Sequence, residues 1–164
     1  MSRYEYSIFW SIMKFPEGCT MMDEKISIDK SIVIIAAEDD NSSYILTEHT
    51  LRRADIENEI IWLKDGHETL AFFYENNGIF DENKKYILLL DIHMPKVDGM
   101  QVLKKIRRDD RFRHNVSVIM LTVDEDPDNT RRCYELGCNA HVIKPADEGL
   151  TGAIGRVAGI LSPV

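Results

Sequence analysis

Residues 86–99 read YILLLDIHMPKVDG, and the prediction of the fold starts from this stretch. Its first part, residues 86–90, is apolar without alternation, which is typical of a strand covered on both faces in a parallel α/β sheet. The apolar run ends at a carboxylate, Asp91, and residues 95–99 then turn the chain into a helical pattern. We therefore expect Asp91 at the carboxyl end of a buried strand, where open α/β sheets bind their ligands.

The composition is that of a globular protein with a single well-formed core. The chain has 164 residues, of which 44% are hydrophobic and 29% charged, and these are ordinary proportions for one domain. The formal net charge of -8 argues against a nucleic-acid partner, because phosphate contacts need a basic face. An acidic rim around a cation site would fit this charge better.

The first part of the chain does not resemble the rest. We predict an N-terminal appendage over residues 1–30, disordered or the product of a misassigned start, and one domain over residues 31–164. The apolar run 8–15 is too short to span a bilayer, and no small-residue cleavage site follows it, so no membrane partner is expected. Translation could start at Met21 or Met22, and an amphipathic arm that docks on the domain is the alternative.

Three cysteines are present, at positions 19, 133 and 138, and none forms a C-x-x-C pair. An odd number without such a pair argues against a disulfide framework and favours a reducing compartment, hence the cytoplasm. Cys133, Cys138 and His141 could be considered as zinc ligands. A fourth ligand is missing, however, and cysteine is a common core residue, so we favour buried thiols.

From residue 31 the chain alternates between strand and helix patterns. Strands are predicted at 32–37, 59–63, 86–90, 116–121 and 140–143, with helices following at 41–54, from 66, from 99, at 127–136 and at 150–161. Ile45, Leu46 and Leu51 are expected to form the buried side of the first helix. Residues 76–85 are expected as a polar loop with an exposed Phe80, and residues 107–115 as a charged connection. Five strands alternating with five helices predict an α/β fold with a doubly wound parallel sheet.

Polar residues follow four of the five predicted strands at the same edge of this sheet. Residues 38–40 are three acids after the first strand, and Asp91, Thr122 and Lys144 follow the third, fourth and fifth strands. Carboxylates brought together repel one another, so they must take up protons or share a cation. Mg²⁺ suits such oxygen ligands. With the acids neutralised, Asp91 can act as a nucleophile towards phosphorus, while Lys144 and the Thr122 hydroxyl meet the transferred oxygens.

This constellation resembles the receiver domain of bacterial two-component response regulators, the CheY-like family, over roughly residues 31–161. The motifs are the acidic cluster 38–40, LLDIHMPKVDG around Asp91, LT at 121–122 and KP at 144–145. The run YELGCNAHVIKP further resembles the single-domain regulators associated with bacterial phytochromes. The resemblance implies a five-stranded (βα)5 flavodoxin-like fold and a stand-alone, phosphorylation-controlled module of two-component signal transduction.

The resemblance also implies roles for individual residues. Asp91 would be the phosphoacceptor, and Mg²⁺ would be held by Asp39 directly, by Glu38 through water, by Asp91 and by the backbone carbonyl of His93. Beyond these metal ligands, the residues that would contact the phosphoryl group or take part in switching are Thr122, Lys144 and His141. The peptide bond between Lys144 and Pro145 would be cis.

The implied partners are a sensor histidine kinase or phosphotransfer protein and a downstream protein target, and the chain could also form a homodimer. The chain would not be an enzyme in the ordinary sense, because it only assists its own Mg²⁺-dependent phosphorylation and dephosphorylation. Neither the donor kinase nor the target can be read from the sequence.

Three departures from the family pattern keep alternatives open. Val123 stands where a small residue is usual and would restrict access to the phosphorylation site, and His141 stands where a Tyr or Phe usually acts as the switch. The small residues at 36–37 have no explanation from sequence.

A pseudo-receiver that binds partners without phosphorylation is one alternative. A haloacid dehalogenase-type phosphatase is another, but it needs an acid where this chain has His93. A flavodoxin is excluded because no Ser/Thr-rich phosphate loop follows the first strand.

Overall fold

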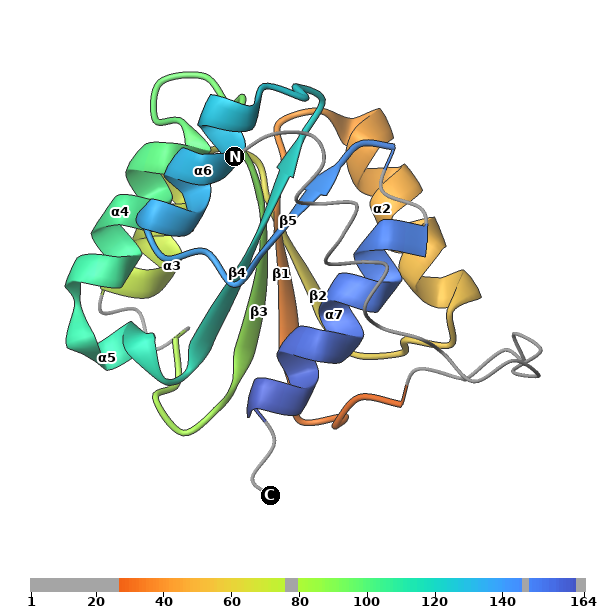
Figure 1. The fold of residues 1–164 in the computed structure, drawn as a ribbon. Helices are drawn as coiled ribbons and strands as arrows, with labels where there is room; N and C mark the ends of the chain where they lie inside the picture. Colours follow the sequence, from red (N-terminus) through yellow and green to blue (C-terminus); the bar gives the residue numbers. More distant parts are fainter. Residues whose placement is uncertain (1–26, 76–79, 146–147, 162–164) are drawn as a thin grey trace, which may run out of the picture.

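Five parallel strands form the centre of the computed structural model, which describes residues 27–75, 80–145 and 148–161 (Figure 1). They are β1 (Val33–Ala37), β2 (Ile60–Leu63), β3 (Tyr86–Asp91), β4 (Val116–Thr122) and β5 (Ala140–Ile143). Their order in the sheet is β2-β1-β3-β4-β5, and every neighbouring pair is parallel. The predicted doubly wound sheet is confirmed, and the winding reverses between β1 and β3.

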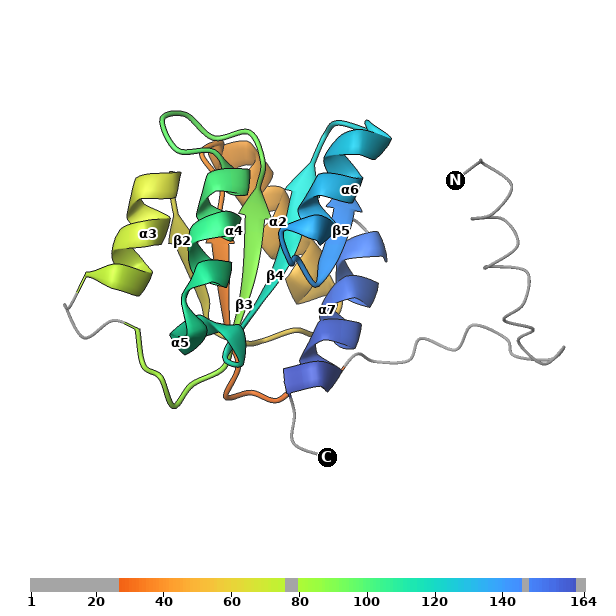
Figure 2. The same cartoon turned by 60° about the vertical axis from the view of Figure 1, so that its left-hand side comes forward.

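Helices cover both faces of the sheet (Figures 1 and 2). One face carries α2 (Asn41–Arg53) and α7 (Glu148–Leu161), and the other carries α3 (Gly66–Tyr74), α4 (Gly99–Arg108), the short α5 (Asp110–Arg113) and α6 (Pro127–Glu135). Within the described ranges, none of these helices combines the length and the apolar character needed to cross a membrane. The predictions for the appendage and for Cys19 lie outside the described residues, apart from positions 27–30.

Both faces of β3 are buried, which explains why its sequence does not alternate. All six of its residues are buried, and alternate side chains belong to two different clusters. Leu88 and Leu90 pack in the cluster beneath α3, α4 and α6, whereas Ile87 and Leu89 pack in the cluster beneath α2 and α7. A strand that feeds two cores must be apolar at every position.

Aspartate side chains cap the N-termini of α2 to α6. The five capping residues are Asp40, Asp65, Asp98, Asp109 and Asp126, and each accepts a hydrogen bond from a backbone N–H of the helix it begins. For the first of these helices, Asp40 accepts from the Ser43 N–H at 2.7 Å. Asp40 is therefore occupied with its helix, which separates it from the acids beside it.

The buried side of α2 differs from the prediction. Leu51 is fully buried, but Ile45 and Leu46 are 55% and 49% exposed. The inward positions of this helix are Thr47 and Leu51, which lie four residues apart on one face, so residues 45 and 46 turn outward. In α7, Leu150, Ile154 and Val157 are buried in the cluster beneath the helix.

Two further predictions were wrong because distant aromatic residues meet below the sheet. Phe80 is half-buried and stacks on Tyr86, with ring centroids 5.1 Å apart. The supposed charged connection contains α5, whose Phe112 is fully buried against Phe73, Phe80 and Tyr74. The contacts of Phe112 join segments more than thirty residues apart, and no local pattern predicts them.

Arg107, also in that stretch, joins α4 to two other parts of the fold. Its guanidinium donates to the carbonyl oxygens of Gly137 at 2.7 Å and Val116 at 2.8 Å, and to the side-chain oxygen of Asn139 at 2.7 Å. Burial lowers the pKa of this guanidinium. Its role is to join the start of β4 to the turn between α6 and β5.

Candidate functional site

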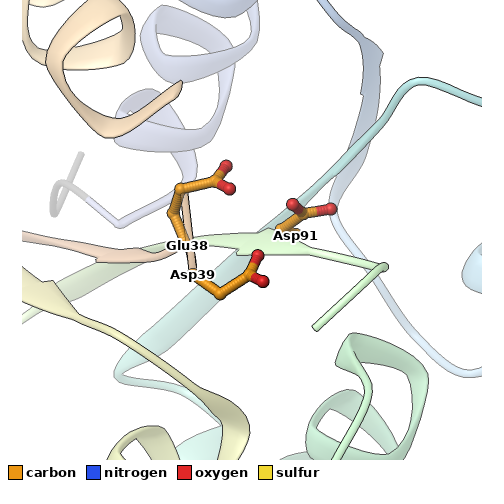
Figure 3. A group of neighbouring side chains, drawn as sticks. All are labelled: Glu38, Asp39 and Asp91. Atoms are coloured by element: carbon orange, nitrogen blue, oxygen red, sulfur yellow. The ribbon is translucent and has the colours of Figure 1, made fainter. Parts of the chain in front are cut away.

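Three carboxylates converge at the carboxyl edge of the sheet, where β1 and β3 end (Figure 3). Glu38 and Asp39 follow β1, and Asp91 is the last residue of β3, the strand that pairs with β1. One carboxylate oxygen from each residue lies within 4.8 Å of the other two. Glu38 and Asp91 are buried, at 4% and 6% exposure, whereas Asp39 is open to solvent. The winding of the sheet reverses at this point, which is where such folds bind ligands.

Lys144 provides the positive charge that holds the two buried acids together. It follows β5 directly, and its ammonium donates to Asp91 Oδ2 at 3.0 Å and makes a shorter contact with Glu38 Oε2. Burial alone would lower the pKa of Lys144, but its hydrogen bond to Glu38 and the charge of Asp91 outweigh burial and raise it. Burial also raises the pKa of Glu38, against the opposing hydrogen bond from Lys144.

The charges and the ligand types of this cluster fit a divalent cation. Three carboxylates and one ammonium carry a net charge of -2 when all are ionised, which a divalent ion would balance. Carboxylate oxygens are ligands for hard cations such as Mg²⁺ and Mn²⁺. Asp39 is exposed and its side chain makes no hydrogen bond or ion pair within the described part of the chain, so it is available as a ligand.

The loop after β3 returns to close against the strand end and orients Asp91. The backbone N–H of His93 donates to Asp91 Oδ1 at 3.0 Å. A Cβ atom at position 99 would lie 2.1 Å from the carbonyl oxygen of Asp91, so only glycine fits there. Both carboxylate oxygens of Asp91 thus have a fixed donor. The predicted metal contact through the His93 carbonyl stays a prediction.

Thr122 and His141, the predicted switch residues, lie on the neighbouring strands β4 and β5. Thr122 is fully buried, and its hydroxyl accepts a hydrogen bond from the Asp124 N–H at 3.0 Å. His141 is half-buried, and its buried Nε2 has no hydrogen-bond partner among the described residues. Burial lowers the pKa of His141. Burying a polar atom without a hydrogen-bond partner costs free energy, so the His141 ring is in an unfavourable environment in this conformation.

Other predictions around the site have definite outcomes. The Lys144–Pro145 peptide bond is cis, as predicted. Cys133 and Cys138 are free, buried thiols, and within the described ranges the only metal-type cluster is that of residues 38, 39 and 91, which does not support the zinc alternative. Val123 is 69% exposed, so its side chain points largely to solvent, and its effect on access stays a prediction.

The structure adds one residue that the sequence reasoning missed. The indole Nε1–H of Trp62, near the end of β2, donates to the carbonyl oxygen of Glu38 at 2.8 Å. The signal available in the sequence was a tryptophan near the end of a strand that neighbours the acidic segment. The register also explains Ala36, because this small residue pairs with Trp62 and leaves room for the indole on the same face of the sheet.

The fold and the position of this site together are those of a receiver domain. The chain matches the family described as the response regulator receiver domain over residues 34–154, and it belongs to that family. Receiver domains are phosphorylated by histidine kinases in two-component signalling. The assignment confirms the CheY-like fold and replaces the phosphatase alternative.

Relatives of known type match the chain over most of their own length. The probable methanogenesis regulatory protein FilR2 of Methanothrix harundinacea is 32% identical over 122 residues, which are 73% of this chain and 76% of that protein. The response regulator Rcp1 of Synechocystis is 30% identical over 112 residues, 68% of this chain and 76% of that protein.

Solved structures agree with the fold and with the narrower resemblance. The bacteriophytochrome response regulator AtBRR superposes with a TM-score of 0.65 at 32% identity, covering 80% of this chain and 95% of that one. A structure of Rcp1 in its Mn²⁺-bound form has a TM-score of 0.59 at 30% identity, covering 78% and 90%. This chain is thus similar to compact receiver-domain regulators, one of which has been seen with a divalent metal.

Replacement of Lys144 by Met should destabilise the fold at neutral pH. It leaves Glu38 and Asp91 buried without a counter-charge, so the free energy of unfolding in urea should fall by about 3 kcal/mol at pH 7. The loss should shrink as the pH falls, because Glu38, whose pKa is raised by burial, then takes up a proton. Lys30→Met is the control, since the ion pair of Lys30 with Glu57 is exposed to solvent. Equal stabilities of the two variants would contradict this account of the site.

His141 should make stability depend on pH below its ordinary pKa of about 6.5. Because burial lowers its pKa in the folded state, the unfolded chain takes up the proton first, and stability is lost as the pH falls. Unfolding free energies at pH 7.5 and 5.5 should therefore differ less in His141→Phe than in the wild type. His49→Gln, at an exposed position, should keep the wild-type difference. An unchanged difference in His141→Phe would refute the assignment.

Proposed function

We propose that this chain is a phosphorylation-controlled binding module that accepts a phosphoryl group on Asp91 from a sensor histidine kinase or a phosphotransfer protein. The observation that carries the proposal is the position of Asp91, at the end of the central strand, between Lys144 and the acids that follow β1. Mg²⁺ is the proposed cofactor, because the cluster offers only oxygen ligands. The free thiols of Cys133 and Cys138 support a reducing compartment, the cytoplasm.

In the proposed reaction, a carboxylate oxygen of Asp91 attacks the phosphorus of a phosphohistidine. A P–O bond forms as the P–N bond breaks, and the donor imidazole leaves with the electron pair and takes up a proton. Bound Mg²⁺, held by Asp39, Asp91 and the His93 carbonyl, with Glu38 acting through water, would neutralise charge on the phosphoryl oxygens. The His93 N–H keeps the carboxylate oriented while its other oxygen contacts Lys144.

Lys144 has two tasks in this proposal. Before transfer its ammonium forms ion pairs with both Glu38 and Asp91, and after transfer it can follow the new negative charge to a phosphoryl oxygen. The Thr122 hydroxyl, which accepts from the Asp124 N–H, can at the same time donate a hydrogen bond to another phosphoryl oxygen. The chain is a phosphoacceptor rather than an enzyme with a separate substrate, and it assists only its own labelling and hydrolysis.

An exposed apolar surface beside the site supports a protein as the phosphodonor. Leu46 of α2 and Val123 after β4 are 49% and 69% exposed. Leu46 and Val123 line a groove of about 260 Å³ together with Lys144 and Pro145. Apolar side chains gathered at the mouth of a charged site are typical of a docking surface. We propose that the donor domain docks there and brings its phosphohistidine to Asp91.

A second surface supports an output partner. Tyr134 of α6 and Ile143 of β5 are 53% and 43% exposed, and His141 lies on β5, the strand that pairs with the strand of Thr122. In the proposal, movement of Thr122 towards the phosphoryl group makes space for the His141 ring to turn inward, which changes the surface offered to a target protein or to a second copy of the chain.

Phosphorylation on Asp91 is tested by intact mass after incubation with acetyl phosphate and Mg²⁺. One phosphoryl adduct should appear, and it should be absent with a chelator or in Asp91→Asn, because both the nucleophile and the neutralising cation are needed. Asp128→Asn, on the exposed face of α6, should be labelled like the wild type. Lack of labelling of the wild type would favour the pseudo-receiver alternative, and full labelling of Asp91→Asn would place the phosphoacceptor elsewhere.

The docking surface is tested with Leu46→Asp. Histidine kinase catalytic regions, autophosphorylated with radiolabelled ATP, are first screened for one that labels the wild-type protein. Transfer from that kinase should be at least about tenfold slower in Leu46→Asp, because a charge would be buried in an apolar contact. Labelling by acetyl phosphate should not change. Tyr134→Asp introduces the same charge on the output surface and should transfer normally, and equal transfer to Leu46→Asp would remove the docking proposal.

A further inference from the structure

Strand β2 holds the acidic segment that follows β1 by two hydrogen bonds to one residue. The backbone N–H of Glu38 donates to the carbonyl oxygen of Leu63 at 3.0 Å. The carbonyl oxygen of Glu38 accepts the indole Nε1–H of Trp62 at 2.8 Å. The first bond continues the backbone ladder between the parallel strands β1 and β2. The second comes from a side chain, and it connects β2 to the chain just beyond the end of that ladder.

The acceptor of this indole is the peptide unit that joins Glu38 to Asp39. A peptide unit is planar, so fixing its oxygen also fixes the direction in which the Asp39 backbone leaves it. The Asp39 side chain is exposed and has no hydrogen bond or ion pair in the described ranges. Its approach to Glu38 and Asp91, visible in Figure 3, therefore depends on the backbone before it.

The indole itself is held in place by stacking. The rings of Trp62 and Tyr44 are parallel within 3°, with centroids 4.4 Å apart, and the ammonium of Lys64 lies 5.3 Å from the centroid of the indole. Tyr44 belongs to the first turn of α2, and its backbone N–H donates to the carbonyl of Asp40. The stack thus connects β2 to the start of the helix on the other side of the acidic segment.

We propose that Trp62 is a positioning residue of the metal site: its indole N–H fixes the Glu38–Asp39 peptide so that the Asp39 carboxylate points to the cation shared with Asp91. This inference rests on the proposed function, since it concerns the same Mg²⁺. Coupling between two sites is reciprocal, so a bond that favours Mg²⁺ binding is itself strengthened when Mg²⁺ binds.

The first test compares Mg²⁺ affinity and thermal stability in Trp62→Phe, which keeps an aromatic ring for Tyr44 but lacks the N–H. Calorimetric titration should show Mg²⁺ binding weakened by about three- to tenfold, the effect of one hydrogen bond. The acetyl phosphate labelling rate should recover at saturating Mg²⁺, because the nucleophile is unchanged. Tyr74→Phe is the matched control, since the Tyr74 hydroxyl donates to the Lys105 carbonyl far from the site, and its Mg²⁺ affinity should be that of the wild type.

A lowered melting temperature with unchanged Mg²⁺ affinity in Trp62→Phe would give Trp62 a purely structural role and overturn the proposal.

The second test needs no change at Trp62. In Trp10→Phe protein, whose only remaining tryptophan is Trp62, the indole proton should exchange with solvent more slowly when Mg²⁺ is present, as reciprocity requires. An exchange rate independent of bound Mg²⁺ would also overturn it. Failure of the wild type to bind Mg²⁺ would contradict the proposed function together with this inference, whereas equal binding by wild type and Trp62→Phe would remove this inference alone.

Discussion

The attraction between one ammonium and two buried carboxylates is the interaction on which the site depends. Glu38 and Asp91 are almost inaccessible to water, and each would be costly to bury as an anion on its own. Lys144 contacts both carboxylates from the end of β5, and it lies 53 residues beyond Asp91 in the chain. The site therefore forms only when β1, β3 and β5 have all taken their places, so the electrostatics of the site report on the complete fold.

The same arrangement explains how three adjacent acids come to have three different environments. Glu38 points inward to Lys144, Asp39 is exposed at the site, and Asp40 turns away to begin α2. Each direction is set by a different neighbour: a lysine after β5, the peptide held by β2, and the first turn of a helix. Charge alone does not distinguish these residues, and an exchange of Glu38 with either aspartate would put a carboxylate of the wrong length in both places.

The sequence was sufficient for features that depend on local patterns. Unbroken apolar runs located the strands, and the polar residues at the strand ends located the site, because parallel strands present their carboxyl ends at one edge. It was insufficient wherever a long-range contact decided the outcome. Phe80 was predicted to be exposed and Phe112 to lie in a charged connection, but their rings contact each other in the structure. Arg107 was assigned to the same charged connection, although its guanidinium donates hydrogen bonds to three oxygens. Ile45 and Leu46 were assigned to the core since apolar residues usually belong there, and only the packing of Thr47 and Leu51 shows that they face outward.

The division of the interior by the sheet has a consequence for how the protein can change over time. Leu88 and Ile87 are neighbours in the chain, but they pack in clusters on opposite faces and share few side-chain neighbours. Energetic effects of substitutions without shared partners tend to add rather than interact. Substitutions can therefore change the side-chain packing beneath α3, α4 and α6 while the packing beneath α2 and α7 is preserved, and the reverse also holds. In this way, substitutions can change the surface on one face of the sheet for a new partner while the core packing on the other face stays the same.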